Sequence, residues 1–267
     1  MIKRPGDKVD AQEFSGEVKG RDFSNSRIEW CRAKGVSFVD CDFSSSLIKN
    51  CYFHRASFKN CKFVGCTIVE SNMRGVSFAS CDFEYATFRS VTLEAQAILR
   101  NLPSWANARR ELLRGLRKNA ESIGEVEDVR LFLAEEMRAS EDHWRSALRK
   151  DQRYYAEHYS GFIRGFVQPN IRLRGLQLGR LFWGHGDSPF RLLLNLFLWV
   201  IFAAIILVLD YSDLRFLSAM KSVVSVILGV SSGNGPMPEW LVLALAASRF
   251  VFLSLFAAVF VRRFARR

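Results

Sequence analysis

Histidine and paired cysteine motifs are scarce in this 267-residue sequence. The four histidines, His54, His143, His158 and His185, are scattered, and no nucleophile or carboxylate accompanies them at a recognisable spacing. The six cysteines form no CxxC pair of the kind that binds zinc. The sequence therefore predicts a protein that is not an enzyme and that holds no metal or other cofactor.

The chain also lacks an apolar leader and a concentrated basic region. Its first residues, MIKRPGDKVDAQEF, contain no hydrophobic core of a signal peptide, so we expect no cleaved leader. Lys and Arg number 38 against 27 Asp and Glu, a net charge of +11, and much of the excess flanks the C-terminal apolar segments. Nucleic acid is not expected as a partner.

Two long apolar runs lie near the C-terminus, at residues 192–209 and 239–261. As helices, both are long enough to cross the roughly 30 Å core of a bilayer. A buried core helix of a soluble protein is the alternative, but two charge-flanked runs in succession favour membrane spans. The flanking arginines predict that both termini face the cytoplasm. These arginines are Arg172, Arg174, Arg180, Arg191, Arg262, Arg263, Arg266 and Arg267.

The segment between the two runs, residues 216–236, does not resemble a simple exposed loop. Its first part, FLSAMKSVVSVIL, is apolar but too short to span, which suits a re-entrant helix buried between other helices. The glycines that follow, Gly229, Gly233 and Gly235, allow a non-helical backbone, which is tolerated at membrane depth only where protein or water satisfies its polar groups. A line of carbonyls facing a water-filled axis meets that condition.

This arrangement resembles the two-span potassium-channel superfamily, with its outer helix, pore helix, filter loop and inner helix. Ser225 falls on the expected pore helix. The filter-like residues are Ser231, Ser232, Gly233, Asn234 and Gly235. The resemblance implies a homotetramer that passes monovalent ions, because one chain supplies a quarter of the filter ring. Asn234 replaces the family's filter tyrosine and Pro236 replaces the following acidic residue, so weak selectivity is expected.

Arg249 falls near the middle of the second apolar run. A cationic side chain at mid-bilayer costs at least about 2.5 to 3.5 kcal/mol, so it should avoid lipid. Two interpretations remain open. Arg249 either lines a water-filled cavity, where it opposes cation passage, or pairs with a carbonyl inside the helix bundle.

Residues 18–93 follow a period of five, which neither a helix nor a simple strand produces but a solenoid with short equivalent sides does. The equally spaced residues are Val18, Phe23, Ile28, Ala33, Phe38, Phe43, Ile48, Phe53, Phe58, Phe63, Ile68, Met73, Phe78, Phe83, Phe88 and Leu93. All six cysteines lie two residues before one of them. In a reduced cytosol they are interpreted as small core residues.

The five-residue units resemble those of pentapeptide-repeat proteins, which coil into a right-handed quadrilateral β-helix with four units per coil. The resemblance implies that Phe23, Phe43, Phe63 and Phe83 stack in one column. The near-identity of KGVSFVDCDF and RGVSFASCDF, 40 residues apart, supports this register. The fold class is therefore mixed, with a β-helix followed by an α-helical connector and a two-span pore module.

The connector, residues 94–169, is predicted to form a helical hairpin. Ser104 is the expected N-cap of its first helix, with Trp105 on the buried stripe, and Gly124 ends that helix. The second helix is expected from about Glu125 to Ser160. Residues 170–189 mix Arg with Leu, Phe and Trp, which suits a helix in the cytoplasmic headgroup layer and a following turn.

The order of segments resembles bacterial membrane proteins that join pentapeptide repeats to a potassium-channel-like pore. The expected divisions are an N-terminal segment 1–17, repeats 18–93, connector 94–169, interfacial segment 170–189 and pore domain 190–267. The expected function is a weakly selective ion channel of the bacterial inner membrane, with a cytoplasmic repeat domain for sensing or assembly through a protein partner. The alternatives are a membrane-depolarising effector of stress or phage defence that the repeats trigger, and a membrane-anchored protein-binding scaffold.

Overall fold

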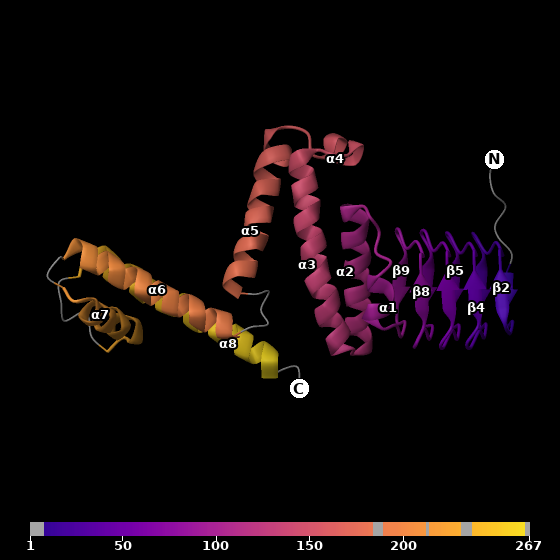
Figure 1. The fold of residues 1–267 in the computed structure, drawn as a ribbon, viewed down its shortest axis with the longest axis horizontal. Helices are drawn as coiled ribbons and strands as arrows, with labels where there is room; N and C mark the ends of the chain where they lie inside the picture. Colours follow the sequence, from indigo (N-terminus) through magenta and orange to yellow (C-terminus); the bar gives the residue numbers. More distant parts are fainter. Residues whose placement is uncertain (1–7, 184–188, 212–213, 231–236, 265–267) are drawn as a thin grey trace. The chain divides into compact units, whose positions relative to one another are not determined.

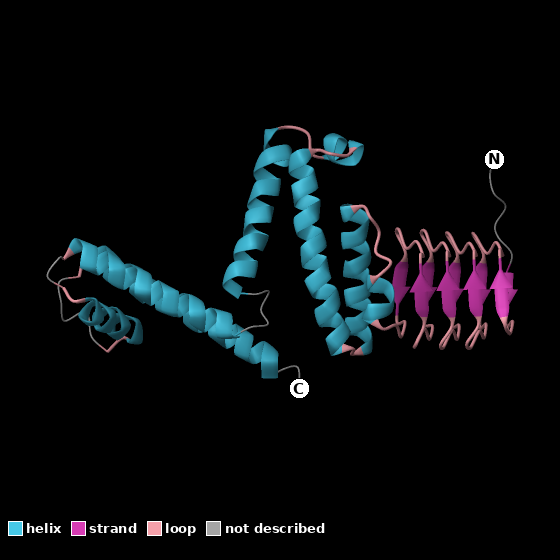
Figure 2. Cartoon of the chain, in the orientation of Figure 1, coloured by secondary structure: helices cyan, strands magenta, loops and turns pink. Residues whose placement is uncertain are grey.

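A computed structural model describes residues 8–183, 189–211, 214–230 and 237–264. The chain divides into two compact units, Met1–Leu173 and Arg174–Arg267, which are described separately. Figure 1 labels the elements of both units, and Figure 2 shows that strands occur in the first unit and helices in both.

Nine three-residue strands form the first part of unit 1 (Figure 1). They are β1 (Lys8–Asp10), β2 (Glu17–Lys19), β3 (Arg27–Glu29), β4 (Ser37–Val39), β5 (Leu47–Lys49), β6 (Ser57–Lys59), β7 (Thr67–Val69), β8 (Ser77–Ala79) and β9 (Thr87–Arg89). Odd-numbered strands form one parallel sheet and even-numbered strands the other. From β2 onward, paired residues are 20 apart, as in Phe38, Phe58 and Phe78. The fold is a β-solenoid of about four turns.

The period of five places one large side chain of each unit inside the solenoid. From Phe23 to Leu93 every residue of that series is buried, whereas Val18 is half-buried. The rings of Phe23, Phe43, Phe63 and Phe83 stack in a column with centroids 4.8 to 5.0 Å apart. All six cysteines are free and buried, which confirms their interpretation as small core residues. Burial raises the pKa of the Cys66 thiol to about 12, so this thiol is protonated and unreactive.

The corners of the solenoid also recur every five residues. Many non-glycine corner residues have a positive φ, a conformation that Asn and Asp tolerate better than bulky residues do. The bulky residues among them are Trp30, Arg55, Glu70 and Tyr85. Their side chains stand outside the core, which explains why the sequence can vary at corners while the inward residues stay large and apolar.

The predicted start of the solenoid at residue 18 is wrong. β1 pairs with β3, and Val9 lies opposite Ile28, so the first coil includes most of the segment assigned to residues 1–17. Phe14 is buried and packs against Phe23 and Phe38. The spacing from Val9 to Phe14 is five residues, but the spacing from Phe14 to Val18 is four. That one-residue shift breaks the sequence period without breaking the coil.

Three helices follow the last strand: α1 (Ala95–Leu99), α2 (Ala106–Ile123) and α3 (Val126–Arg149). Residues of all three belong to the same buried core as the solenoid phenylalanines. The predicted connector is therefore not a separate domain at its start, because its first helices cover the open end of the solenoid. Hydrophobic burial joins the two parts into one folding unit.

Two asparagines complete the backbone pairing at that end. The Asn119 amide accepts a hydrogen bond from the Val91 N–H (2.9 Å) and donates one to the Val91 carbonyl (2.8 Å). Asn101 accepts from the Cys81 N–H (3.0 Å) and donates to the Phe78 carbonyl (3.1 Å). Each side-chain amide stands in for the peptide group of a further coil, which protects a strand edge that would otherwise be unpaired.

Several predicted helix boundaries are wrong. The N-cap of α2 is Trp105 and not Ser104, and the Trp105 side chain is 47% exposed because its extended backbone holds it outside the helix stripe. The second helix ends at Arg149, where Lys150 takes a left-handed conformation, and α4 (Arg153–His158) follows. A short π-helix, Ile163–Val167, then leads into α5 (Gln168–Trp183).

In its described part, unit 2 contains three helices beyond α5: α6 (Pro189–Asp210), α7 (Phe216–Leu228) and α8 (Glu239–Phe264). Both predicted spans fall within α6 and α8, and the expected short apolar helix is α7. We call residues 190–267 the C-terminal hairpin. A small core of buried residues joins its three helices: Val200, Ala203, Ala204, Leu207, Ala219, Val223, Val226, Leu241 and Leu245.

Candidate functional site: the C-terminal hairpin

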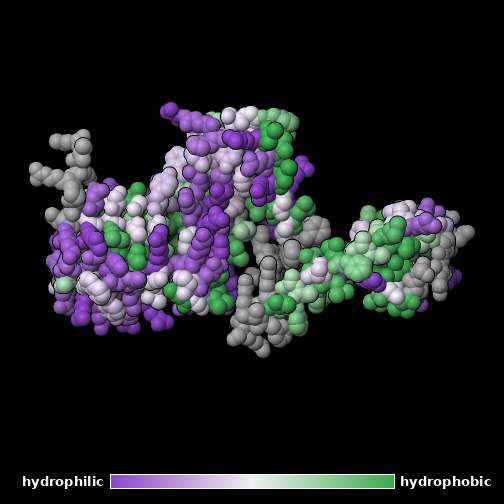
Figure 3. Space-filling view, turned by 180° about the vertical axis from the view of Figure 1, so that it is seen from behind, coloured by the Kyte–Doolittle hydropathy of each residue, from purple (hydrophilic) through white to green (hydrophobic). Residues whose placement is uncertain are grey.

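Helices α6 and α8 have the length and composition of membrane spans. Residues Leu192–Asp210 and Glu239–Ala258 meet that test, although core helices of soluble proteins can also meet it. Most of their large apolar side chains face outward, as Figure 3 shows by the green surface over these helices. Phe197 is 54% exposed, Leu243 70% and Phe250 65%. Water would be a poor solvent for such a surface.

Short helix α7 packs against both long helices. Ala219, Val223 and Val226 form its buried stripe, and they belong to the same core as the small residues Ala203 and Ala204 of α6. Small side chains on α6 allow close approach of the two helix backbones. The position of α7 is therefore set by packing along its length and not by its two connecting segments alone.

The predicted filter residues, Ser231, Ser232, Gly233, Asn234 and Gly235, lie outside the described residues. Ser225 of the predicted pore helix is half-buried, and its hydroxyl donates to the Ser222 carbonyl one turn earlier (2.8 Å). A serine bonded to its own helix in this way is common in apolar surroundings. This hydrogen bond explains how Ser225 is accommodated among apolar neighbours.

Helix α7 ends at Gly229, and Arg249 of α8 contacts that end. Gly229 has a φ of 72°, and a side chain there would collide with the Arg249 guanidinium. The final carbonyls of a helix carry partial negative charge, so a cation beside them is stabilising. The guanidinium also lies 4.8 Å from the ring centroid of Phe250. Sequence reasoning found Arg249 but missed its contact with Gly229, since nothing local links two residues 20 positions apart.

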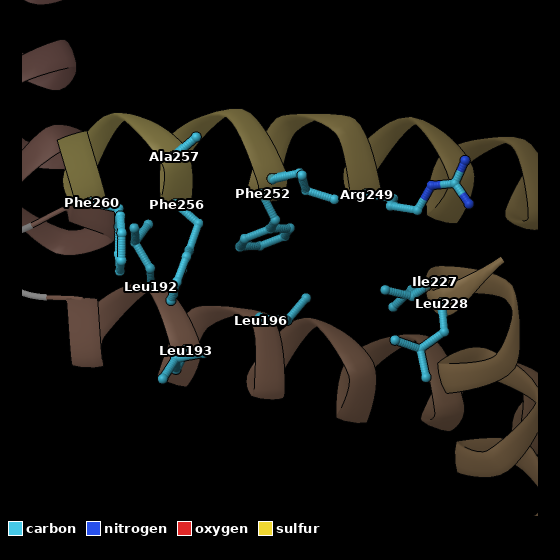
Figure 4. A pocket seen from close by; sticks show the side chains of 11 residues that line it. Leu192, Leu193, Leu196, Ile227, Leu228, Arg249, Phe252, Phe256, Ala257 and Phe260 are labelled. Carbon is cyan, nitrogen blue, oxygen red and sulfur yellow. The ribbon is translucent and has the colours of Figure 1, made fainter.

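An apolar groove of 570 Å³ extends from Arg249 along the hairpin (Figure 4). Leu192 and Leu196 of α6, Ile227 and Leu228 of α7, and Phe252 and Phe256 of α8 are among its lining residues. Arg249 is the charged residue among the lining side chains. It thus both contacts the end of α7 and borders the groove, so both interpretations of this residue retain a structural basis.

A polar contact also joins the two long helices. The Trp199 indole N–H of α6 donates to the Ser248 hydroxyl of α8 (3.2 Å), and that hydroxyl donates to the Leu245 carbonyl (2.8 Å). Ser248 precedes Arg249, so this contact holds the α8 turn that presents the guanidinium. Neither residue was singled out from the sequence, because a tryptophan and a serine in apolar runs give no pairing signal.

Outside the hairpin, α3 carries a buried histidine, His143. Its two ring nitrogens lie 3.1 Å from the hydroxyls of Tyr155 and Tyr159. Burial, with a smaller contribution from the Arg110 charge, lowers the His143 pKa to about 4. Within the described ranges there is no cluster of three or more His, Cys, Asp and Glu side chains suited to a metal. His143 is best explained as a neutral residue that holds α4 against α3.

Comparison with known families identifies the first part of the chain. Residues 48–101 match the model of pentapeptide repeats (9 copies), which places β5 to α1 within that class. The chain therefore contains a pentapeptide-repeat domain with a β-solenoid fold. The match ends at residue 101, just after α1, where the structure has left the solenoid.

Three solved structures illustrate this similarity. HetL, a pentapeptide repeat protein involved in heterocyst differentiation regulation in Nostoc sp. strain PCC 7120, is 14% identical with a TM-score of 0.18; the match covers 35% of this chain and 45% of HetL. A thylakoid-lumen pentapeptide repeat protein of Arabidopsis thaliana is 17% identical, with 36% and 77% covered and a TM-score of 0.16. QnrB1, a plasmid-mediated fluoroquinolone resistance protein, is 15% identical, with 34% and 74% covered and a TM-score of 0.14. No curated protein matches.

Proposed function

We propose that this protein is a weakly selective membrane ion channel, built as a homotetramer, with its pentapeptide-repeat domain serving sensing or assembly in the cytoplasm. The observation that carries the proposal is the position of α7. It is a short apolar helix packed against two span-length helices, and its C-terminal end leads into the filter-like residues 231–235. A re-entrant pore helix has this relation to its neighbours.

The outward-facing apolar surface supports the membrane part of the proposal. α6 has 22 residues and α8 has 26, so as ideal helices they extend over about 33 and 39 Å. These lengths are sufficient for a bilayer core, the second with some tilt. The side chains that would face lipid, such as Phe197, Leu243 and Phe250, are large and exposed on the single chain.

Arg249 has a defined role in this proposal. Its guanidinium neutralises the carbonyl end of α7 and so holds the turn at Gly229 that leads into the filter-like segment. On the groove side, the same charge disfavours cations in the inner cavity. Both effects predict a pore with less preference for potassium than a filter of carbonyl oxygens alone would give.

The direct test is ion conduction by the purified full-length chain in planar bilayers. Currents are measured under potassium, sodium and chloride gradients, and the oligomeric state is measured by crosslinking in the same membranes. Substituting Asn234→Ala or Gly235→Ala should shift the reversal potential. The control Ser254→Ala removes an exposed hydroxyl that bonds the Val251 carbonyl on α8, and it should leave the reversal potential unchanged.

Two results would overturn the channel proposal in different directions. If the protein inserts as a monomer and carries no current under any of these gradients, it is not a channel, and the membrane-anchored scaffold becomes the favoured interpretation. A leak that neither Asn234→Ala nor Gly235→Ala alters favours the depolarising effector, because such a leak does not depend on a filter.

A further inference from the structure

The two sides of the solenoid that lie between its sheets carry opposite charges. The residues Arg32, Lys34, Arg55 and Arg74 lie on one side, which we call the basic side, with Glu13 in the first coil and Glu94 at the other end. The residues Asp22, Asp42, Asp82 and Glu84 lie on the other, the acidic side, together with the cations Arg21 and Lys62. Backbone bridges place Arg32, Tyr52 and Asn72 in adjacent coils of the basic side, and Asp42, Lys62 and Asp82 in adjacent coils of the acidic side.

The cations of the basic side form no ion pair with a carboxylate among the described residues. Lys34 and Arg74 are two coils apart in one column, with His54 between them. Arg55 and Arg74 lie in adjacent coils, where the Arg55 N–H donates to the Arg74 carbonyl (2.9 Å). Arg55 packs over Gly75 of the next coil, where a Cβ would lie 3.1 Å from the Arg55 Cγ. On the neighbouring sheet, by contrast, Arg27 pairs with Glu29 (2.8 Å) and Lys49 with Glu70 (3.5 Å).

Aromatic side chains accompany these cations. The Tyr52 ring lies against His54 with centroids 5.7 Å apart, and Tyr52 remains 38% exposed. Trp30, at the corner before Arg32, is 62% exposed. Arg32, Lys34, Tyr52 and the acidic Glu13 are among the residues that line a hollow of 700 Å³. Exposed Trp and Tyr beside Lys and Arg are typical of surfaces that meet lipid headgroups.

We propose that the basic side binds the phosphate headgroups of an anionic phospholipid surface. The choice of a membrane over an acidic protein rests on the proposed function, because a chain that carries its own membrane spans holds the solenoid at high effective concentration beside lipid. Each Lys or Arg near an anionic surface adds to the attraction, and the acidic side would orient the solenoid by repulsion. Salt should weaken the contact.

The buried native cysteines allow a site-specific test. Tyr52→Cys on the basic side and Tyr85→Cys on the acidic side replace two exposed tyrosines and can each carry a nitroxide label. The full-length protein is reconstituted into vesicles of phosphatidylcholine alone or with one third phosphatidylglycerol. Spin-label accessibility to lipid-soluble and water-soluble relaxants is then measured. The expected result is lipid contact at residue 52 in anionic vesicles, with loss of that contact in neutral vesicles and none at residue 85.

Two charge variants test whether lipid is attracted by the cations of the basic side or by the net positive charge of the solenoid. Arg32→Gln, Lys34→Gln, Arg55→Gln and Arg74→Gln together should abolish the contact. The control combines Lys19→Gln, Lys59→Gln, Lys62→Gln and Arg89→Gln, which removes the same charge from exposed positions on the other sides and should preserve the contact. Circular dichroism melting checks that both variants fold. Asn72→Cys provides a second label position on the basic side.

The remaining outcomes overturn the proposal. If labels at residues 52 and 72 stay in water in anionic vesicles, or if both charge variants lose the contact equally, the basic side does not bind lipid. If added polyglutamate shields the label at residue 52 from the water-soluble relaxant and the label shows no lipid contact, the basic side binds an acidic polypeptide instead. Ion currents are measured in the same vesicles, so that a failure of lipid binding by the basic side can be distinguished from a failure of the channel proposal.

Discussion

The solenoid and the C-terminal hairpin use large apolar side chains in opposite ways. In the solenoid, Phe58 is 1% exposed and contacts rings in its own and neighbouring coils. In the hairpin, Phe250 is 65% exposed, and the small core consists mostly of Ala, Val and Leu. The first pattern stabilises a fold by removing apolar surface from water. The second leaves apolar surface exposed on the single chain, which is why the hairpin is the part of the chain that suggests a membrane.

The largest expected effect is therefore on the solenoid core. Phe58→Ala should lower the free energy of unfolding by about 3 to 5 kcal/mol, because it removes a buried ring and leaves a cavity. Leu253→Ala on α8, where the side chain is 64% exposed, should change the stability of the reconstituted protein by less than about 1 kcal/mol. Thermal melts followed by circular dichroism measure both. Equal losses would contradict the contrast between the two regions.

The next effect concerns the closed end of the solenoid. Asn119→Ala should cost about 2 kcal/mol, since the buried Val91 N–H and carbonyl both lose their partner. Asn60→Ala, at an exposed site with one hydrogen bond to Asp40 (3.2 Å), is the matched control. It should lower the free energy of unfolding by about 0.5 kcal/mol. Hydrogen exchange should show faster opening of β9 in the Asn119 variant. Unchanged protection of Val91 would argue against the capping role.

In the hairpin, the corresponding weak point is the turn at Gly229. Gly229→Ala should destabilise the hairpin by about 1 to 2 kcal/mol, because it imposes a strained positive φ and displaces Arg249. Gly175→Ala in α5 has open space around the new Cβ and should be neutral or slightly stabilising. The two variants are compared by the temperature at which each detergent-solubilised protein aggregates. A harmless Gly229→Ala would mean that the Arg249 contact does not hold the end of α7.

The smallest effect, counted per pH unit, lies in the helices that follow the solenoid along the chain. The His143 pKa is about 4 in the folded protein against 6.5 as the ordinary value. Between these values the unfolded chain binds a proton that the folded chain does not, so this contribution to stability is complete above pH 6.5 and is lost as pH falls toward 4. We expect a slope of about 1 kcal/mol per pH unit in that window. Denaturant titrations at several pH values should show the slope, and His143→Gln should remove most of it.

Much of the solenoid could be predicted because its information is local and repeated. Each unit places a large residue such as Phe43 or Phe63 inward, and adjacent coils reinforce one register. The first coil was missed because the four-residue spacing between Phe14 and Val18 hides the same geometry from a strict period. Two helix limits were also missed. Trp105 is an extended N-cap and Lys150 a left-handed C-cap, and neither residue type favours that position.

In the hairpin, composition predicted the extent of α6, α7 and α8, but not their contacts. A sequence shows that Arg249 is unusual in an apolar run; it does not show that the guanidinium meets Gly229, or that Trp199 bonds Ser248. The conducting role, the tetramer and the roles of residues 231–235 remain predictions for the experiments above.

By itself, the sequence determined a solenoid of five-residue units followed by helices and two span-length apolar segments, because hydrophobic periodicity and run length are properties of neighbouring residues. Only the tertiary structure decided where the coil begins, how Asn101 and Asn119 close it, and which side chain holds the end of α7. Those contacts join residues 19 or more positions apart, and such pairs are selected by the packing of the whole chain and not by local preference.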